Sequence, residues 1–292
     1  MSKTASLIRV TVVYVIAFGV FAAWFAWGPR SSHLWLDGLI ADLLATVVVF
    51  VASRLYDNSS FYDPYWSVLP PLLALAWWLE LGVPTNDLRA WLVMLVILLW
   101  AVRLTGNWIY TWPGVHHEDW RYPMLKEKAG RSEFVVDLMG IHVFPTLVVF
   151  AGMLPVYLVL TYRDRAIGWL DVLALAVGIG AVVLEFVADL QMHRFAATKE
   201  PGQVMDRGLW SWSRHPNYVG EVSFWLALGL FGLAAAPGAW GWALIGTVLM
   251  LAMFLGASIP MMEKRSLERR PAYQDVINRV SLFIPRPPRR ST

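Results

Sequence analysis

The chain has 292 residues, of which 58% are hydrophobic and only 15% are charged, and its formal net charge is +3. A soluble domain carries about 25% charged residues, so this composition excludes an ordinary soluble enzyme and indicates a protein that crosses the membrane several times. The mean hydropathy of +0.52 agrees with this class. The sequence contains no cysteine, which excludes a disulfide framework and thiolate metal ligands.

Eight apolar segments approach the length of about 20 residues that a membrane-spanning helix requires. They are Leu7–Trp27, Leu36–Ser53, Tyr65–Leu81, Leu88–Tyr110, Val135–Tyr162, Ile167–Leu190, Val219–Ala236 and Trp240–Met261. The third is the weakest, because Pro70 and Pro71 interrupt it. The sequence therefore predicts an all-α polytopic membrane protein of about seven or eight transmembrane helices, in which loops on one side form a site.

Basic residues predict how these segments are oriented. With eight spans, one side of the membrane would hold only Arg30, Arg89, Arg163 and Arg165 of the 24 Lys and Arg residues. The positive-inside rule makes the other side cytoplasmic. That side carries both termini and the two long polar loops, 113–131 and 194–216. We expect a single membrane domain over residues 1–292, with peripheral N-terminal spans over 1–60 and a core over 61–292.

The stretch from Gly208 to Glu221 is the densest polar cluster beside an apolar segment. Arg214 and His215 could meet a phosphate, and Pro216 favours a helix start whose free N–H groups attract anions. A polar cap at the membrane interface is the plainer interpretation. A second cluster, Glu185-x3-Asp189-x3-His193, shares one helix face, and its alternative role is an ion pair that locks two helices.

Two loop segments complete the polar inventory. The first, His116–Tyr122, resembles a metal site, yet the chain has only six histidines and this is its only adjacent pair, so we expect no metal. We expect instead a loop that contacts a cofactor, and a plain polar loop is the alternative. The second, Asp57–Trp66, contains Asp63, which could donate a proton to a substrate oxygen if burial raises its pKa. Its alternative role is to cap the helix that starts at Pro64.

The run Gly-Leu-Trp-Ser-Trp-Ser-Arg-His-Pro-Asn-Tyr-Val-Gly-Glu over 208–221 resembles the C-terminal signature of the steroid 5α-reductase family, especially its bacterial branch. The segments 118–122, 189–195, 262–267, 271–273 and 283–285 fit the same pattern. The resemblance is good from about residue 100 onward and weak over the first 60 residues. The Arg-His-Pro-x-Tyr core is also similar to isoprenylcysteine and phospholipid methyltransferases, which bind S-adenosylmethionine.

The family resemblance implies an NADPH-dependent membrane reductase that passes a hydride to the C4–C5 double bond of a 3-oxo-Δ4-steroid or a similar lipid enone. It implies an acid and a tyrosine at the ketone oxygen, where donors stabilise the developing enolate. Asp63 stands where that acid is expected, beside Tyr62 and Tyr65. The tyrosine expected three residues before Arg103 is Trp100, which leaves Tyr62, Tyr65 and Tyr110 as second donors to test.

The remaining site expectations follow from the same resemblance. Substrate contacts are expected from Asn58, Tyr62, Trp66 and Trp100. Cofactor contacts are expected from Arg103, Asn107, Glu118, Asp119, Arg121, Tyr122, Glu185, Asp189, His193, Arg194, Lys199, Arg207, Ser213, Arg214, His215, Asn217, Tyr218, Glu221, Glu263 and Arg265.

Two other functions stay open at the level of sequence. One is an S-adenosylmethionine-dependent lipid or isoprenyl methyltransferase, and the other is a transporter or structural membrane protein with buried ion pairs. The crowding of polar residues at one side rather than the midplane argues against a transporter. We expect a hydrophobic lipid substrate such as a steroid or sterol, surrounding bilayer lipid, no nucleic-acid partner, a plausible monomer, and a place in a bacterial inner membrane with the cofactor site and C-terminus cytoplasmic.

Overall fold

The computed structural model describes residues 2–288, and every regular element among them is a helix, as the sequence predicts. The long helices are α1 (Lys3–Trp27), α2 (Leu34–Leu55), α3 (Tyr65–Glu80), α4 (Leu88–Thr111), α7 (Phe144–Thr161), α8 (Trp169–Thr198), α9 (Pro216–Ala235) and α10 (Trp240–Met253). The shorter ones are η1 (Ser59–Phe61), α5 (Arg121–Ala129), η2 (Gly130–Ser132), α6 (Glu133–Val135), η3 (Val136–Val143), η4 (Gly208–Ser211), η5 (Pro237–Ala239), η6 (Phe254–Ser258), α11 (Ile259–Arg269) and α12 (Tyr273–Arg279).

Seven helical segments are long and apolar enough to cross a membrane, which makes this an integral membrane protein. Two of them are composite, because α5–α7 form one segment over Arg121–Thr161 and η5–α11 form another over Pro237–Arg269. The third predicted span, α3, is a helix of 16 residues with Pro70 and Pro71 inside it. It is about 24 Å long at 1.5 Å per residue, and it is therefore shorter than the other seven.

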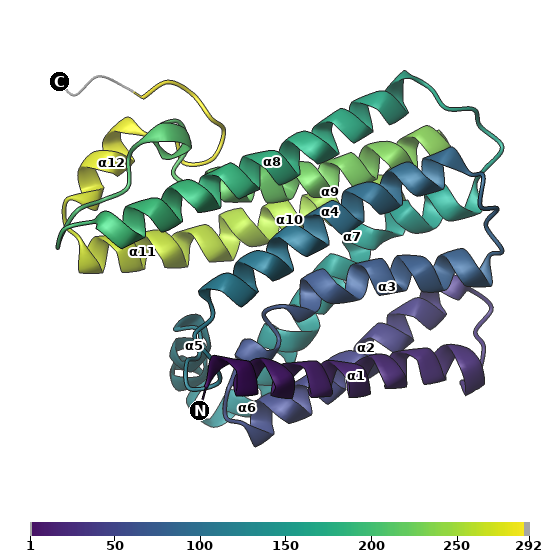
Figure 1. Cartoon of the computed structure of the whole chain (residues 1–292), viewed down its shortest axis with the longest axis horizontal. Coiled ribbons are helices and arrows are strands. Elements are labelled where there is room, and N and C mark those ends of the chain that lie inside the picture. Colours follow the sequence, from purple (N-terminus) through teal and green to yellow (C-terminus); the bar gives the residue numbers. More distant parts are fainter. Residues whose placement is uncertain (1, 289–292) are drawn as a thin grey trace.

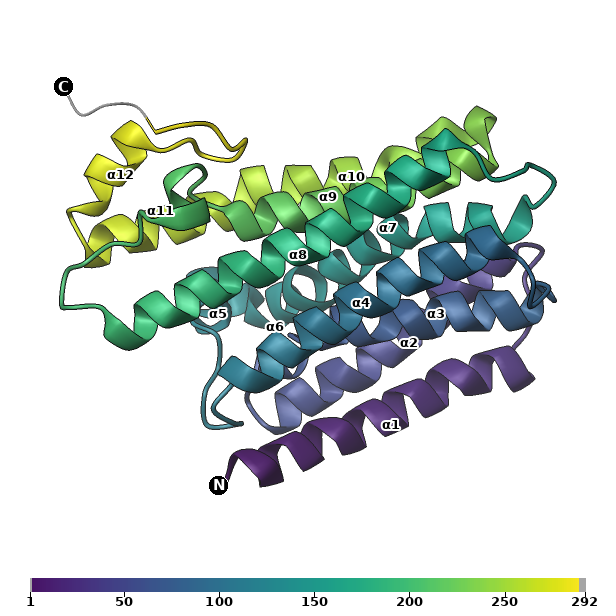
Figure 2. The ribbon, with the colours of Figure 1, turned by 45° about the horizontal axis from the view of Figure 1, so that its top comes forward.

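The described part of the chain begins and ends at the same end of the helical bundle (Figure 1). Seven crossings would place these two points at opposite ends, so α3 also runs from one end of the bundle to the other. The loops between α4 and α5 and between α8 and α9 lie at this same end, together with α11 and α12 (Figures 1 and 2). We call this the site end, because it gathers the polar residues described below.

One contiguous apolar core joins α1–α4, α7–α10 and the start of α11, and a smaller cluster of Tyr273, Val276 and Val280 seats α12 at the site end. Helices α8 and α9 run side by side, and α1 lies at the outer edge next to α2 (Figure 2). Large apolar side chains also point outward from the bundle, for example Val15, Val172 and Val248, which are 66%, 63% and 58% exposed. An outer surface of this kind suits lipid, not water.

Two spans approach closely where α7 meets α10. A Cβ atom added to Gly246 would lie 2.2 Å from the Cα atom of Gly152, and one added to Gly152 would lie 2.3 Å from the indole of Trp225. Small residues are what allow helix backbones to approach in a membrane. This crossing therefore fixes α10, and with it the segment η6–α11 that continues α10 toward the site end.

Gly246→Val should destabilise the protein by about 1–3 kcal/mol, because the added side chain would overlap backbone atoms that cannot move away cheaply. Thermal unfolding in detergent measures this as a lower midpoint. Gly241→Val on the same helix is the matched control, since a Cβ atom there meets nothing within 4 Å. Equal midpoints for the two variants would show that the crossing is not tight.

Candidate functional site

A short turn before α3 is held against the α4–α5 loop by a row of hydrogen bonds. The side-chain amide of Asn58 donates to the carbonyls of Val115 and His117 at 2.7 and 3.0 Å. The backbone N–H of Ser59 donates to Glu118 at 2.8 Å. The backbone N–H of Asp119 donates to the hydroxyl of Ser60, also at 2.8 Å. These bonds join two segments far apart in the chain, and Asp63 follows directly after them.

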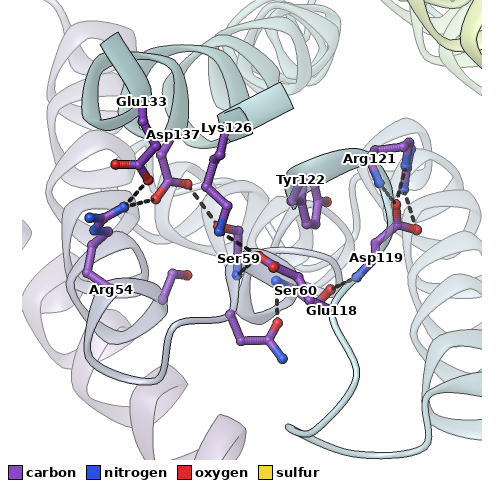
Figure 3. A network of polar contacts seen from close by, with 12 residues as sticks. Arg54, Ser59, Ser60, Glu118, Asp119, Arg121, Tyr122, Lys126, Glu133 and Asp137 are labelled. Atoms are coloured by element: carbon purple, nitrogen blue, oxygen red, sulfur yellow. Dashed lines mark hydrogen bonds and ion pairs between the residues drawn. The ribbon is translucent and has the colours of Figure 1, made fainter. Parts of the chain in front are cut away.

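Charged side chains extend this attachment to α5 and η3, as Figure 3 shows. Lys126 pairs with Glu118 at 2.8 Å. The hydroxyl of Ser59 donates to Asp137 at 2.9 Å, and Arg54 pairs with Asp137 at 3.1 Å and closely with Glu133. Asn58 and Glu118, which were expected to meet substrate and cofactor, therefore serve to fasten the turn.

Asp63 and Tyr122 form the most direct acid–hydroxyl contact of the site. The phenol of Tyr122, on α5, donates a short hydrogen bond to Oδ1 of Asp63. Loss of water around Asp63 raises its pKa from 3.8 to about 6, although the positive charge of Arg121 and the Tyr122 hydrogen bond oppose this rise. Arg121 is itself oriented by Asp119, whose carboxylate it meets at 2.8 Å. A carboxyl with this pKa can hold a proton near neutral pH.

A cavity of about 590 Å³ lies beside this pair. Polar groups line one part of it, namely Asp63, Tyr122, Asp119, Arg121 and Asn107, and apolar side chains line most of the rest. Its size falls within the range of about 300–1,000 Å³ that is usual for small-molecule sites.

Two π-helical segments, η3 and η6, contribute to the walls of this cavity. Val136, Gly140 and Ile141 come from η3, and Phe254, Ala257 and Ser258 come from η6. Wide helical turns of this kind occur often at functional sites, because they displace the backbone from the regular helix. The cavity also contains Trp108, whose buried indole N–H has no partner among the described residues and is available to a ligand oxygen.

A second cavity, of about 320 Å³, lies between α8, the first turn of α9, and α11–α12. Asp189, His215, Asn217, Tyr218 and Arg270 contribute polar groups to its lining. The ring of Tyr218 lines both this cavity and the larger one, and it is stacked between His215 and Phe254 at centroid distances of 5.5 and 4.3 Å. A ligand that passes Tyr218 could therefore reach both spaces.

Arg214, which also lines the second cavity, is bonded to other residues of the chain. Its guanidinium meets Glu263 at 2.6 Å and donates to the carbonyls of Ile277 and Val280 at 3.0 and 2.8 Å. It thus ties the beginning of α9 to α11 and α12. His215 also meets Glu263, at 3.3 Å, so Glu263 holds the wall together. The guanidinium carbon of Arg265, on α11, lies 3.8 Å from the ring centroid of Trp120, and this contact joins α11 to the α4–α5 loop.

A buried ion cluster lies on the inner side of these cavities. Arg103, on α4 and only 8% exposed, pairs closely with Glu185, with Asp189 at 2.9 Å, and with Glu221 at 4.0 Å. Three helices are joined by this one cation. The sequence left two roles open for Glu185 and Asp189, namely a functional site or an ion pair that locks two helices together. The structure contains this ion pair.

Glu221 is enclosed by aromatic residues in the same region. The indole N–H groups of Trp100 and Trp225 donate to its two carboxylate oxygens at 3.0 and 2.9 Å. Trp100 is fully buried against Phe224 and lies outside the lining of the large cavity. Trp100 therefore holds Glu221, and its expected position beside a substrate does not match the lining that the structure gives.

A third cavity, of about 520 Å³, lies between α4 and α8 and shares Asp189 with the second cavity and Asn107 with the largest. Tyr110, His193 and Arg194 line it. The other expected cofactor residues lie apart. Lys199 and Arg207 are exposed and outside all three linings, whereas Ser213 is buried and accepts the backbone N–H of His215 at 3.1 Å.

The tyrosines proposed as second donors are distributed differently from the expectation. Tyr62 lines the large cavity with its hydroxyl bonded to Thr146 at 2.8 Å, and Trp66 lines it as well. Tyr65 points to α2, where its hydroxyl donates to Asp42 at 2.9 Å, and Tyr110 belongs to the third cavity. The sequence placed Tyr122 with the cofactor loop. Its contact with Asp63 was missed because the two residues meet only when the turn and the loop are joined.

The fold and the site define a polytopic membrane protein with linked polar cavities at one end of its bundle. Residues 49–280 match the family described as "Protein of unknown function (DUF1295)". This is most of the chain, so the chain belongs to that family.

A relative in Schizosaccharomyces pombe, "Uncharacterized protein C594.04c", is 28% identical over 280 residues, which cover 88% of this chain and 81% of the relative. No solved structure matches the chain.

Tyr122→Phe should raise the pKa of Asp63 further above about 6, because the carboxylate would lose the hydrogen bond that favours its charged form. The carbonyl stretch of the protonated carboxyl, followed by infrared spectroscopy as a function of pH, measures this shift. Asp63→Asn identifies the signal by removing it. A pKa that stays the same or falls in Tyr122→Phe would mean that the phenol does not bond to Asp63.

Proposed function

We propose that this protein is an NADPH-dependent reductase of a lipid enone, such as a 3-oxo-Δ4-steroid reduced at its C4–C5 double bond. The observation that carries the proposal is the Asp63–Tyr122 pair in the wall of a largely apolar cavity. An enone accepts hydride at its β-carbon only when its oxygen is polarised, and two adjacent proton donors at a fixed point supply that polarisation.

The acid has the properties that this step requires. With a pKa of about 6, Asp63 holds its proton in part of the molecules near neutral pH and can release it as negative charge develops on the substrate oxygen. Once Asp63 carries a proton, the single O–H of Tyr122 can turn from Asp63 to the same substrate oxygen, and Arg121 beside them favours the negative charge. Methyl transfer to a nucleophile does not need a proton donor, so this pair favours reduction over the methyltransferase alternative.

Polar groups that line the second cavity support the cofactor that the proposal requires. This cavity contains the first turn of α9, which attracts anions, together with the cationic side chain of Arg270 and the imidazole of His215. Asn217 and Asp189 offer polar atoms for a sugar or an amide, and Tyr218 lies where this cavity meets the larger one. NADPH bound here would supply a hydride at the Tyr218 side of the large cavity.

The charge distribution supports the proposed cytoplasmic position of the site. The site end contains the basic segments that the positive-inside rule assigns to the cytoplasm, and cellular NADPH is available there.

Asp63→Asn should lower the rate of enone reduction by about 10²–10⁴-fold, because the amide cannot release a proton. NADPH consumption at 340 nm with a panel of steroid, sterol and simple enones measures the rate, and calorimetry measures cofactor affinity, which should change little. Asp57→Asn is the control, since Asp57 is exposed and lies six positions earlier in the same segment. Loss of NADPH binding in Asp63→Asn would contradict the proposed role of the acid.

The rate should also depend on pH through the same carboxyl. Because the protonated form acts, kcat should fall as pH rises through about 6, the pKa of Asp63, and it should level off at lower pH. In Asp63→Asn the residual rate should lack this inflection. A wild-type rate that instead rises through the same interval would mean that the charged carboxylate is the active form.

A further inference from the structure

The large cavity has exposed apolar residues at one side. Gly140, Phe144 and Ala257 all line the cavity and are all exposed, and Phe144 is 49% exposed. Gly140 and Phe144 belong to the η3–α7 span, and Ala257 belongs to the α10–α11 span. The cavity thus reaches the surface between two membrane-spanning segments. We call these three residues the mouth.

The depth of the mouth follows from the lengths of the two spans. At about 1.5 Å per residue, Gly140 and Ala257 each lie about 30 Å from the far ends of their spans at Thr161 and Pro237. The hydrocarbon core of a bilayer is also about 30 Å thick. The mouth therefore lies where the hydrocarbon meets the headgroups on the site side. Met139 and Leu255, next to the mouth, are apolar and 51% and 41% exposed, which suits contact with lipid.

The polar groups of the cavity lie apart from the mouth in the chain. Asp63 belongs to the turn before α3, and Tyr122, Arg121 and Asp119 belong to the start of α5 and the loop before it. The mouth residues are Gly, Phe and Ala, which offer no side-chain hydrogen bond. A molecule bound with its oxygen at Asp63 would find polar partners there, whereas the three side chains of the mouth offer only apolar contacts.

We propose that this mouth is a lateral opening into the bilayer, through which the substrate enters and in which its apolar end remains, and that Gly140 sets the width of the opening. This inference rests on the proposed function for the identity of the reacting group, an enone. The opening itself rests on the geometry of the two π-helical segments. A substrate that reaches the site in this way is drawn from the membrane and need not dissolve in water.

Gly140 offers a clean way to narrow the mouth. A Cβ atom added there meets only one side-chain atom within 4 Å, Cγ1 of Val136 at 3.9 Å, so a larger residue does not clash with the fold. Gly256 is the matched control. It is exposed in the facing π-helical segment, a Cβ atom there meets nothing within 4 Å, and it lies outside the cavity lining.

Gly140→Phe should lower kcat/KM for a 3-oxo-Δ4-steroid in lipid nanodiscs by about tenfold or more, whereas a small water-soluble enone such as 2-cyclohexenone should change by less than about twofold. NADPH affinity should stay unchanged, Gly140→Ala should have a smaller effect, and Gly256→Phe should leave both substrates unaffected. An unchanged rate with the steroid, or an equal loss with both enones, would overturn the role of Gly140.

The absence of native cysteine allows a test that does not depend on activity. Gly140→Cys in nanodiscs should react faster with an uncharged maleimide dissolved in the lipid than with a charged maleimide in the water. Faster reaction with the aqueous reagent would overturn the lateral opening. If the wild-type protein reduces no enone, the proposed reaction fails, and this labelling still decides whether the cavity opens to the bilayer.

Discussion

One guanidinium holds together the helices on which the candidate site is built. Arg103 reaches Glu185 and Asp189 on α8 and Glu221 on α9 from its place on α4. Within a membrane-spanning bundle such charges are costly unless they are paired, and removal of one partner leaves the others uncompensated. The pairing therefore fixes α4, α8 and α9 relative to one another. The second and third cavities lie along these helices, and both include Asp189 in their lining.

The other half of the site depends on hydrogen bonds outside the spans. The turn that carries Asp63 is fastened to the loop that leads to Tyr122 through Asn58, Ser59 and Glu118. These bonds bring an acid and a phenol together in the lining of the large cavity. Tyr218, on α9, lines both the large cavity and the second cavity. The proposed reaction uses this junction, with proton donors in the large cavity and polar groups for the cofactor in the second.

The sequence predicted the helical class and the gathering of polar residues well, because both follow from local composition. Apolar segments of sufficient length give spans in any context, and the spacing of Glu185, Asp189 and His193 places them on one helix face. The helix α3 was the weakest of the predicted spans, and with 16 residues it is shorter than each of the seven membrane-spanning segments of the structure.

Contacts between distant segments could not be predicted in the same way. The Asp63–Tyr122 bond joins residues 59 positions apart, and it depends on a row of loop hydrogen bonds that no local pattern records. Nothing in the sequence around Trp100 indicates its hydrogen bond to Glu221. In the sequence Arg214 looks like a phosphate ligand, whereas in the structure its guanidinium is paired with Glu263. The mouth was missed because η3 and η6 depart from regular α-helix, a feature that apolar periodicity does not reveal.

The most direct test of the account is the fate of the cofactor's hydrogen. Purified protein should be incubated with a lipid enone and NADPH that carries deuterium at the transferable position, and the product should be examined by mass spectrometry and NMR. The account predicts one deuterium at the former β-carbon, and in the same incubation time far less labelled product when Asp63→Asn replaces the wild type. An unlabelled, unreduced enone across the panel, together with tight binding of S-adenosylmethionine, would contradict it and favour methyl transfer.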